Sequence, residues 1–119
     1  MALSLTQDVT DAFNANNGYV ADASNWDYLI WQFVSPSGTI SVTATNDAGS
    51  VTGSFEGNSL TATNFATIVA LNLASTTSAL VTAVSSAGLY RVDRSGQFIK
   101  FGGASAAATK VIIQYHKIS

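Results

Sequence analysis

The sequence contains no cysteine, and only one histidine, one glutamate and one proline. Without cysteine there is neither a disulfide framework nor a thiolate metal site, so packing and backbone pairing must supply the stability. The single proline, Pro36, lies in a turn-like run, Ser35-Pro36-Ser37-Gly38, where its fixed φ is useful. So few catalytic side chains lead us to expect a protein that is not an enzyme, with no metal and no cofactor.

Charged residues are also scarce, at 10% of the chain, whereas ordinary soluble domains carry about 25%. A small domain with so few charges usually has less of its surface facing water than a monomer would. We therefore expect the chain to oligomerise or to dock on another protein.

The few charges are segregated along the sequence. Residues 1–56 hold six acids and no Lys or Arg, a net charge of −6, and residues 57–90 hold no charge. Residues 91–119 hold five bases and one acid, a net charge of +4. Either acidic and basic strands lie side by side in one subunit, or opposite ends of neighbouring subunits attract each other.

Neither a membrane nor a nucleic acid is an expected partner. The first residues, Met1 to Thr6, lack the basic and apolar regions of an export signal, and no apolar run approaches the ~18 residues of a spanning helix. The net charge is −2, and five cations are too few for a groove that follows a nucleic-acid backbone.

Alternation of polar and apolar residues predicts an all-β fold. Residues 39–45 alternate throughout, and residues 50–56 repeat the pattern after a turn that contains Gly49, which predicts a hairpin. About eight strands at regular spacing predict an antiparallel β-sandwich, a jelly roll or an Ig-like Greek key, over residues 25–119. The other expected strands are 26–34, 64–73, 79–84, 89–93, 97–101 and 109–118.

Two segments allow more than one interpretation. Residues 1–24 are expected to form an N-terminal arm or turn region, in which residues 6–13 are a short helix or an extended arm, followed by a turn at residues 14–18. Residues 102–108 are all small and predict a flexible loop or a close contact with a neighbour.

The run Ser86-Ala87-Gly88-Leu89-Tyr90 is similar to the tyrosine corner of Greek-key sandwiches. Gly88 stands two residues before Tyr90 at the start of an expected strand. We expect the Tyr90 hydroxyl to bond to the backbone and to fix this corner.

The residues that could carry out catalysis or bind a metal are better explained by structural roles. His116 has Gln114 and Ile118 as its strand neighbours and no acid near it in sequence, so a hydrolytic triad is disfavoured. Asp22 and Asp27 lie on either side of Trp26 in the sequence, and glycosidases use two carboxylates near aromatic side chains, so this pair is a candidate for glycoside chemistry. A turn at Asp22 and the start of a strand at Asp27 explain these acids better. The run Asn46-Asp47 matches no defined calcium loop.

The segment Trp26 to Val34 is the most aromatic in the chain. Trp26 and Tyr28 fall on one face of the expected strand, and Trp31 and Phe33 fall on the other. If one set is exposed, it is a sugar platform or a partner surface; if both are covered, they form the core of a central strand. The second interpretation is favoured, and burial against a neighbouring subunit would satisfy both.

Four runs stand out in the C-terminal half: Ala74 to Thr77, Ser86-Ala87-Gly88-Leu89-Tyr90-Arg91-Val92-Asp93, Ser95 to Gly103, and the last strand, Thr109 to Tyr115. Through these runs the chain shows a resemblance to small structural proteins of tailed bacteriophages. The resemblance covers about the last fifty residues, and the N-terminal half carries no matching signature.

The resemblance implies a capsid decoration or cement protein, a β-sandwich that binds the major capsid protein shell, commonly as a homotrimer on the virion surface after synthesis in the host cytoplasm. The other class that fits is a carbohydrate-binding or adhesin module of a phage tail or fibre. The candidate interface residues are Trp26, Tyr28, Trp31, Phe33, Arg91 and Arg94, with Gly88 and Tyr90 as the structural corner.

Overall fold

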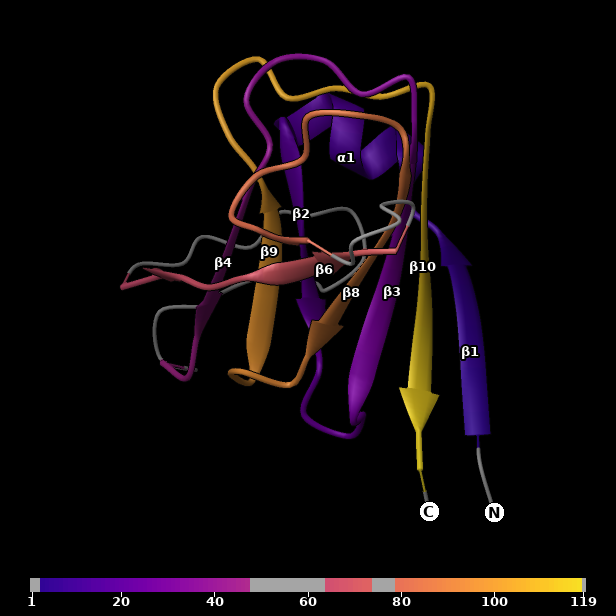
Figure 1. The fold of residues 1–119 in the computed structure, drawn as a ribbon, viewed down its shortest axis with the longest axis vertical. Coiled ribbons are helices and arrows are strands. Elements are labelled where there is room, and N and C mark those ends of the chain that lie inside the picture. Colours follow the sequence, from indigo (N-terminus) through magenta and orange to yellow (C-terminus); the bar gives the residue numbers. More distant parts are fainter. Residues whose placement is uncertain (1–2, 48–63, 74–78, 119) are drawn as a thin grey trace.

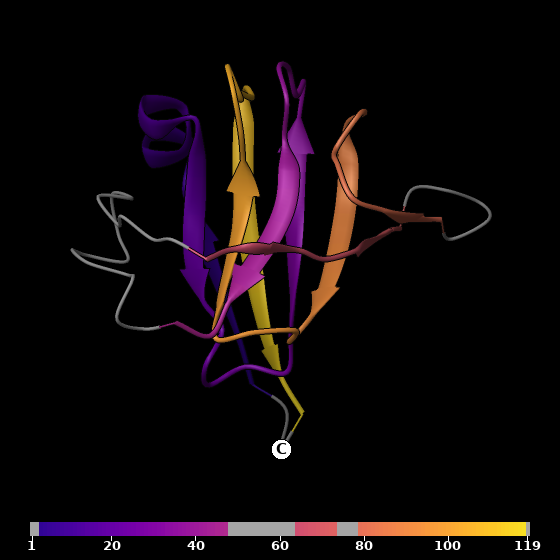
Figure 2. The same ribbon diagram turned by 90° about the vertical axis from the view of Figure 1, so that its left-hand side faces the viewer.

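A computed structural model describes residues 3–47, 64–73 and 79–118 of the chain. In these residues ten strands form two antiparallel sheets that face each other, and there is one short helix (Figures 1 and 2). This confirms the expected all-β sandwich. The elements are β1 (Leu3–Asp8), α1 (Thr10–Asn16), β2 (Gly18–Asp22), β3 (Tyr28–Val34), β4 (Ser41–Thr45), β5 (Ala66–Thr67), β6 (Ala70–Asn72), β7 (Leu80–Val81), β8 (Gly88–Asp93), β9 (Phe98–Gly102) and β10 (Lys110–Lys117).

The larger sheet has the strand order β1-β10-β3-β8-β6-β7, and the smaller sheet has the order β2-β9-β4-β5. Leu3 pairs with Lys117, so the first and last described strands, β1 and β10, lie side by side (Figure 1). The strand β3 lies between β10 and β8, which makes it a central strand of the larger sheet.

The core forms because the apolar side chains of β3, β8 and β10 recur at every second residue. Trp31 and Phe33 of β3 point inward and are 0% and 1% exposed. The Trp31 ring lies 4.5 Å from the ring of Phe101 in the opposite sheet. Full burial of one such side chain stabilises the fold by about 1.5–3 kcal/mol.

Residues 3–24 differ from the arm that was expected over residues 1–24. Leu3–Asp8 adds a strand to the larger sheet, Gly18–Asp22 adds one to the smaller sheet, and the helix lies between them. Both interpretations of residues 6–13 were partly right, because this segment contains the end of a strand and the start of the helix. The helix ends at Asn16, and the capping residue Asn17 adopts a left-handed φ of 55°, as residues at helix C-termini often do.

The expected strand at residues 64–73 is in fact two short strands in different sheets. β5 pairs with β4 in the smaller sheet, and β6 pairs with β8 in the larger one, so the chain crosses between the layers here. The second strand of the predicted 39–56 hairpin lies outside the described residues. β4 itself pairs with β9 and β5.

The loop after β9 is tied into the subunit, which corrects the expectation of a flexible loop. The Asn14 side chain donates to the Ala108 carbonyl at 2.8 Å and accepts from the Ala108 N–H at 2.9 Å. Ser37 and Ala107 form an additional β-bridge, and Ala106 is fully buried. Small residues occur here because this loop runs close to the connection between β3 and β4, which contains Ser37 and Gly38.

The connection into β8 is held by a side chain. The Tyr90 hydroxyl donates a hydrogen bond to the carbonyl oxygen of Ser86 at 2.6 Å, the backbone bond that the sequence led us to expect. Gly88 has a φ of 151°, which side chains of L residues rarely allow. The two residues therefore fix the bend that leads into the strand.

Candidate functional site

The larger sheet has a broad face that points away from the core, which we call the outer face. Along β10 and β3 the inward side chains are buried, whereas the outward ones are partly or fully exposed. β8 repeats this alternation. The outer face is therefore built from every second residue of β1, β10, β3, β8, β6 and β7.

Aliphatic side chains gather on the outer face, where polar ones are usual. Cross-strand pairing places Ile30 beside Arg91, Arg91 beside Leu71, and Leu71 beside Leu80. Leu80 is 67% exposed and Leu89 is 41% exposed. We call this set the apolar patch; it consists of Ile30, Val69, Leu71, Leu80, Leu89 and Ile112.

The outer face is also shallowly hollowed. One depression of about 330 Å³ is lined by three patch residues, Ile30, Leu89 and Ile112, together with three polar neighbours. A second, of about 210 Å³, is lined mainly by Val69, Leu71 and Leu80 and by the pair formed by Arg91 and Asp93. Exposed apolar surface with a polar border is typical of a protein-binding surface.

Tyr28 forms the border of the patch with a neighbour on each side. The His116 ring of β10 stacks on the Tyr28 ring with centroids 4.6 Å apart and planes 7° apart. The Arg91 guanidinium of β8 lies 4.0 Å from the Tyr28 ring centroid and its Nε donates to Asp93 Oδ1 at 2.9 Å. Tyr28 and Asp93 thus hold the Arg91 guanidinium in place, with its charge beside the patch.

The side chains considered for catalysis serve the backbone or one another. His116 Nε2 lies 2.7 Å from Gln114 Oε1. Asp22 Oδ1 accepts from the N–H and hydroxyl of Ser24, and Asp27 Oδ2 accepts from the N–H of Ile118. The turn interpretation of Asp22 is therefore confirmed.

A separate groove lies at the open side of the sandwich, between β1 and β2. It measures about 230 Å³, and we call it the Trp26 groove; it is lined by Leu5, Gln7, Tyr19, Asp22, Asn25, Trp26 and Tyr115. The Trp26 ring packs on the Tyr115 ring with centroids 5.5 Å apart. Burial raises the pKa of Tyr115, so its hydroxyl stays protonated and donates to Gln7 Oε1 at 2.9 Å.

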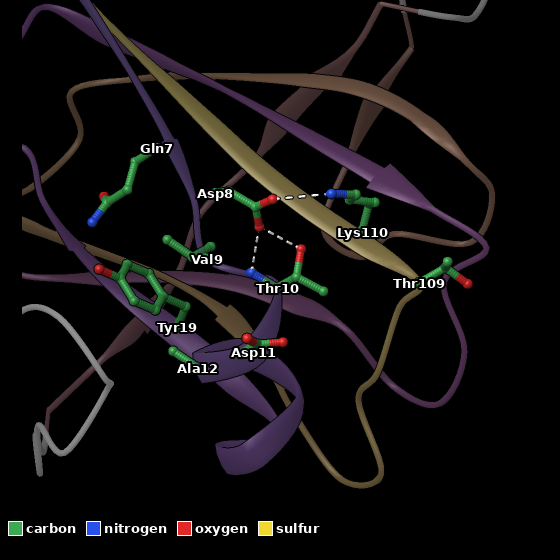
Figure 3. Close-up of a pocket in the computed structure, with 9 residues that line it drawn as sticks. All are labelled: Gln7, Asp8, Val9, Thr10, Asp11, Ala12, Tyr19, Thr109 and Lys110. Carbon is green, nitrogen blue, oxygen red and sulfur yellow. Dashed lines mark hydrogen bonds and ion pairs between the residues drawn. The ribbon is translucent and has the colours of Figure 1, made fainter.

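A wider, polar hollow of about 720 Å³ adjoins this groove and shares Gln7 and Tyr19 with it (Figure 3). Its central feature is Asp8, whose Oδ1 accepts from the hydroxyl and N–H of Thr10 and whose Oδ2 accepts from Lys110 at 3.1 Å. These hydrogen bonds, chiefly that of the Thr10 hydroxyl, lower the pKa of Asp8 to about 2. Thr10 Oγ1 also accepts from the N–H of Val111, so the cluster fastens the start of α1 to β10.

The six predicted interface residues do not share one surface. Trp31 and Phe33 are buried in the core, as the interpretation of their segment as a central strand predicted. Tyr28 and Arg91 meet on the outer face. Arg94 is exposed just beyond β8.

Trp26 does not share a face with Tyr28, contrary to the expectation from alternation. The strand begins at Tyr28, after a turn in which the Trp26 N–H donates to the Ala23 carbonyl. Trp26 packs on Tyr115, whose side chain points inward. Alternation therefore does not extend back to residue 26.

Sequence reasoning missed the apolar patch. A signal was present, because Val111-Ile112-Ile113 and Leu29-Ile30-Trp31 put apolar residues on both faces of their strands. Such runs indicate a strand that is covered on both sides. In the structure one of those sides is the outer face.

The described residues contain neither a cluster of metal ligands nor a membrane-spanning helix. Among residues 3–47, 64–73 and 79–118, no group of three His, Cys, Asp or Glu side chains could hold a metal ion. None of the helical segments described is long and apolar enough to cross a membrane.

Comparison with known proteins finds a likeness at the level of structure. No family model matches the chain, and no curated protein sequence matches it. The chain is similar to the crystal structure of the SPBc2 prophage-derived protein YomS, with a TM-score of 0.64 and 10% sequence identity. The alignment covers 100% of this chain and 96% of the YomS chain. The likeness shows that the two chains share a fold.

Proposed function

We propose that this chain is a structural protein of a bacteriophage particle, a capsid decoration protein that binds the shell of major capsid protein through its outer face. The observation that carries the proposal is the apolar patch. It spreads over several strands of one sheet, it is partly exposed, and a positioned Arg91 borders it. A stable sheet face of this kind suits the flat surface of a protein shell.

Three further observations support the proposal. The chain carries 10% charged residues, which fits a surface that is partly covered in use. A protein of prophage origin shares the fold. The C-terminal residues Gly88 to Asp93 resemble elements of phage structural proteins.

The proposed contact has an apolar centre and a charged border. Each Å² of apolar surface that leaves water contributes about 25 cal/mol, before the cost of association is subtracted. Leu80 and Leu89 offer the most exposed aliphatic area near the centre. The pair of Arg91 and Asp93 fixes orientation rather than affinity, because side chains that are 40% and 75% exposed are screened by water.

The test is co-sedimentation of the purified chain with empty heads of the phage that encodes it. We expect saturable binding that Leu80→Asp weakens by at least about tenfold, because a buried unpaired charge costs more than 1.4 kcal/mol. Leu80 is 67% exposed, so the fold should tolerate the change. Ala104→Asp is the matched control, since it adds the same charge at an exposed loop position and should bind normally.

Absence of binding to heads would contradict the proposal. So would equal binding of Leu80→Asp and wild type, because the shell would then contact another surface. Binding to isolated tails in place of heads would move the protein to another part of the particle and would overturn the decoration role.

Glycan binding is the second candidate function, and the Trp26 groove favours it. Pyranose rings pack on aromatic side chains, and amides and carboxylates beside the ring bind their hydroxyls. Asn25 and Asp22 stand on the rim of the groove beside Trp26. A glycan array distinguishes the two functions.

Under this second function, Asn25→Ala should abolish the array signal and Leu80→Asp should leave it unchanged, since only the first residue lines the groove. The Asn25 side chain is exposed, so the change is expected to preserve the fold. An array without signal for the wild-type chain removes glycan binding.

A further inference from the structure

β1 is an edge strand of the larger sheet, and its outer side has no neighbouring strand among the described residues. Five of its six residues are exposed. The other edges differ: β5 and β7 have two residues each, and four of the five residues of β2 are buried. Thus β1 is the one long and exposed edge among the described strands.

The backbone groups of β1 that face this open side can be identified. The Val9 N–H donates to the Val111 carbonyl of the neighbouring chain segment, so Val9 points its backbone groups toward β10. In an antiparallel pair this direction alternates along the strand. Leu5 and Gln7 therefore also point toward β10, and the N–H and C=O groups of Ser4 and Thr6 point outward.

This edge lacks the features that usually prevent strand addition. Natural edge strands are blocked by proline, lysine, bulges or short length. Leu3-Ser4-Leu5-Thr6-Gln7-Asp8 has no proline and no lysine, and its one charge, Asp8, is already paired with Lys110 inside the subunit. Leu3 and Leu5 are each 52% exposed, which is unfavourable for a free monomer.

We propose that two copies of this chain associate by antiparallel pairing of β1 with β1, about a twofold axis at Leu5. In this register Leu5 lies opposite the partner's Leu5, at a position where facing side chains come closest. Ser4 lies opposite the partner's Thr6, and their outward backbone groups bond to each other. The two larger sheets become one continuous sheet.

A second copy fits this edge better than an unrelated strand for two reasons. The apolar side chains meet each other at the axis and lie beside the Trp26 groove, which Leu5 lines. No like charges oppose each other between Leu3 and Gln7, because that run is uncharged. A twofold pairing closes after two copies, so it predicts a dimer and departs from the trimer that the phage resemblance implies.

The first test is the mass of the full chain in solution by light scattering. The wild type should have twice the chain mass of 12.3 kDa. Thr6→Pro should have the mass of one chain, because it removes an outward N–H and leaves the bonds to β10 in place. Thr6→Val keeps the N–H and should remain a dimer. A wild-type monomer, or a dimer of Thr6→Pro, would overturn the proposal.

The second test uses the wild-type chain and does not depend on the folding of a variant. Amide exchange measured by NMR should show Ser4 and Thr6 protected by at least about tenfold more in concentrated than in dilute protein. Leu5 should be protected at both concentrations, because its N–H points to β10. Unprotected Ser4 and Thr6 in an oligomer would place the contact elsewhere. Neither test involves phage heads, so this inference and the decoration role can fail separately.

Discussion

Asp8 shows how single residues join the acidic and basic parts of this sequence. Its carboxylate belongs to the acidic first half of the chain, and Lys110 belongs to the basic last part. They pair within one subunit because β1 and β10 are neighbours in the sheet. For this pair, the interpretation that opposite charges lie side by side in one subunit is confirmed.

The lowered pKa of Asp8 predicts a pH dependence. A carboxyl with a pKa of about 2 in the folded chain and an ordinary value of 3.8 stabilises the fold above pH 3.8, and the contribution is lost as the pH falls toward 2. The melting temperature of Asp8→Asn should therefore be a little lower than that of wild type at pH 6, and the two should converge near pH 2. The effect is small because both partners are half exposed. A constant difference across this range would show that the charge of Asp8 does not matter.

At the level of elements, period-two patterns predicted most strands but not the ends of the chain. β3, β4, β8, β9 and β10 lie within one or two residues of their expected positions. β3, β4, β8 and β10 alternate against a buried core. β9 is buried at four of five positions, and the glycine-containing turns on both sides of it gave its position. β1 and β2 were missed for different reasons. Leu3 to Asp8 is mostly exposed and has only two apolar residues, Leu3 and Leu5, so it shows no buried face. Gly18–Asp22 is buried at four of five positions, so it shows no alternation.

The connection into β8 gives a prediction at this scale. Tyr90→Phe removes the 2.6 Å bond to the Ser86 carbonyl and should lower the free energy of unfolding by about 1 kcal/mol. Urea denaturation measures this change. Tyr28→Phe is the matched control; its hydroxyl has no hydrogen bond within the described ranges, so the loss should stay within about 0.5 kcal/mol. Equal losses in both variants would show that the hydroxyl bond does not fix the corner.

At the level of the whole molecule, the two proposed surfaces reinforce each other. Pairing of β1 with its copy about an axis through the sheet keeps both outer faces on the same side. A dimer would then present two apolar patches to one shell, and the second contact would form at high effective concentration. Modest affinity per subunit would suffice for stable attachment.

The sequence predicted that a surface would be covered, but it did not locate that surface. Scarce charge indicated docking, and Tyr28 and Arg91, two of the candidate interface residues, meet on the outer face. Trp31 and Phe33 were named as candidate interface residues, but they fill the core, as the favoured interpretation of the aromatic segment predicted, because they face the smaller sheet. The patch is assembled from single aliphatic residues on separate strands, so only the strand order brings Ile30, Leu71 and Leu80 together.

Hydroxyl-radical footprinting of the chain bound to phage heads tests the central claim most directly. We expect oxidation of Leu80 and Leu89 to fall sharply on binding, because both lie in the apolar patch. Phe65, which lies near Lys100 of the smaller sheet, should remain as reactive as in the free chain. Protection of Phe65 together with unchanged oxidation of Leu80 and Leu89 would show that the outer face is not the docking surface.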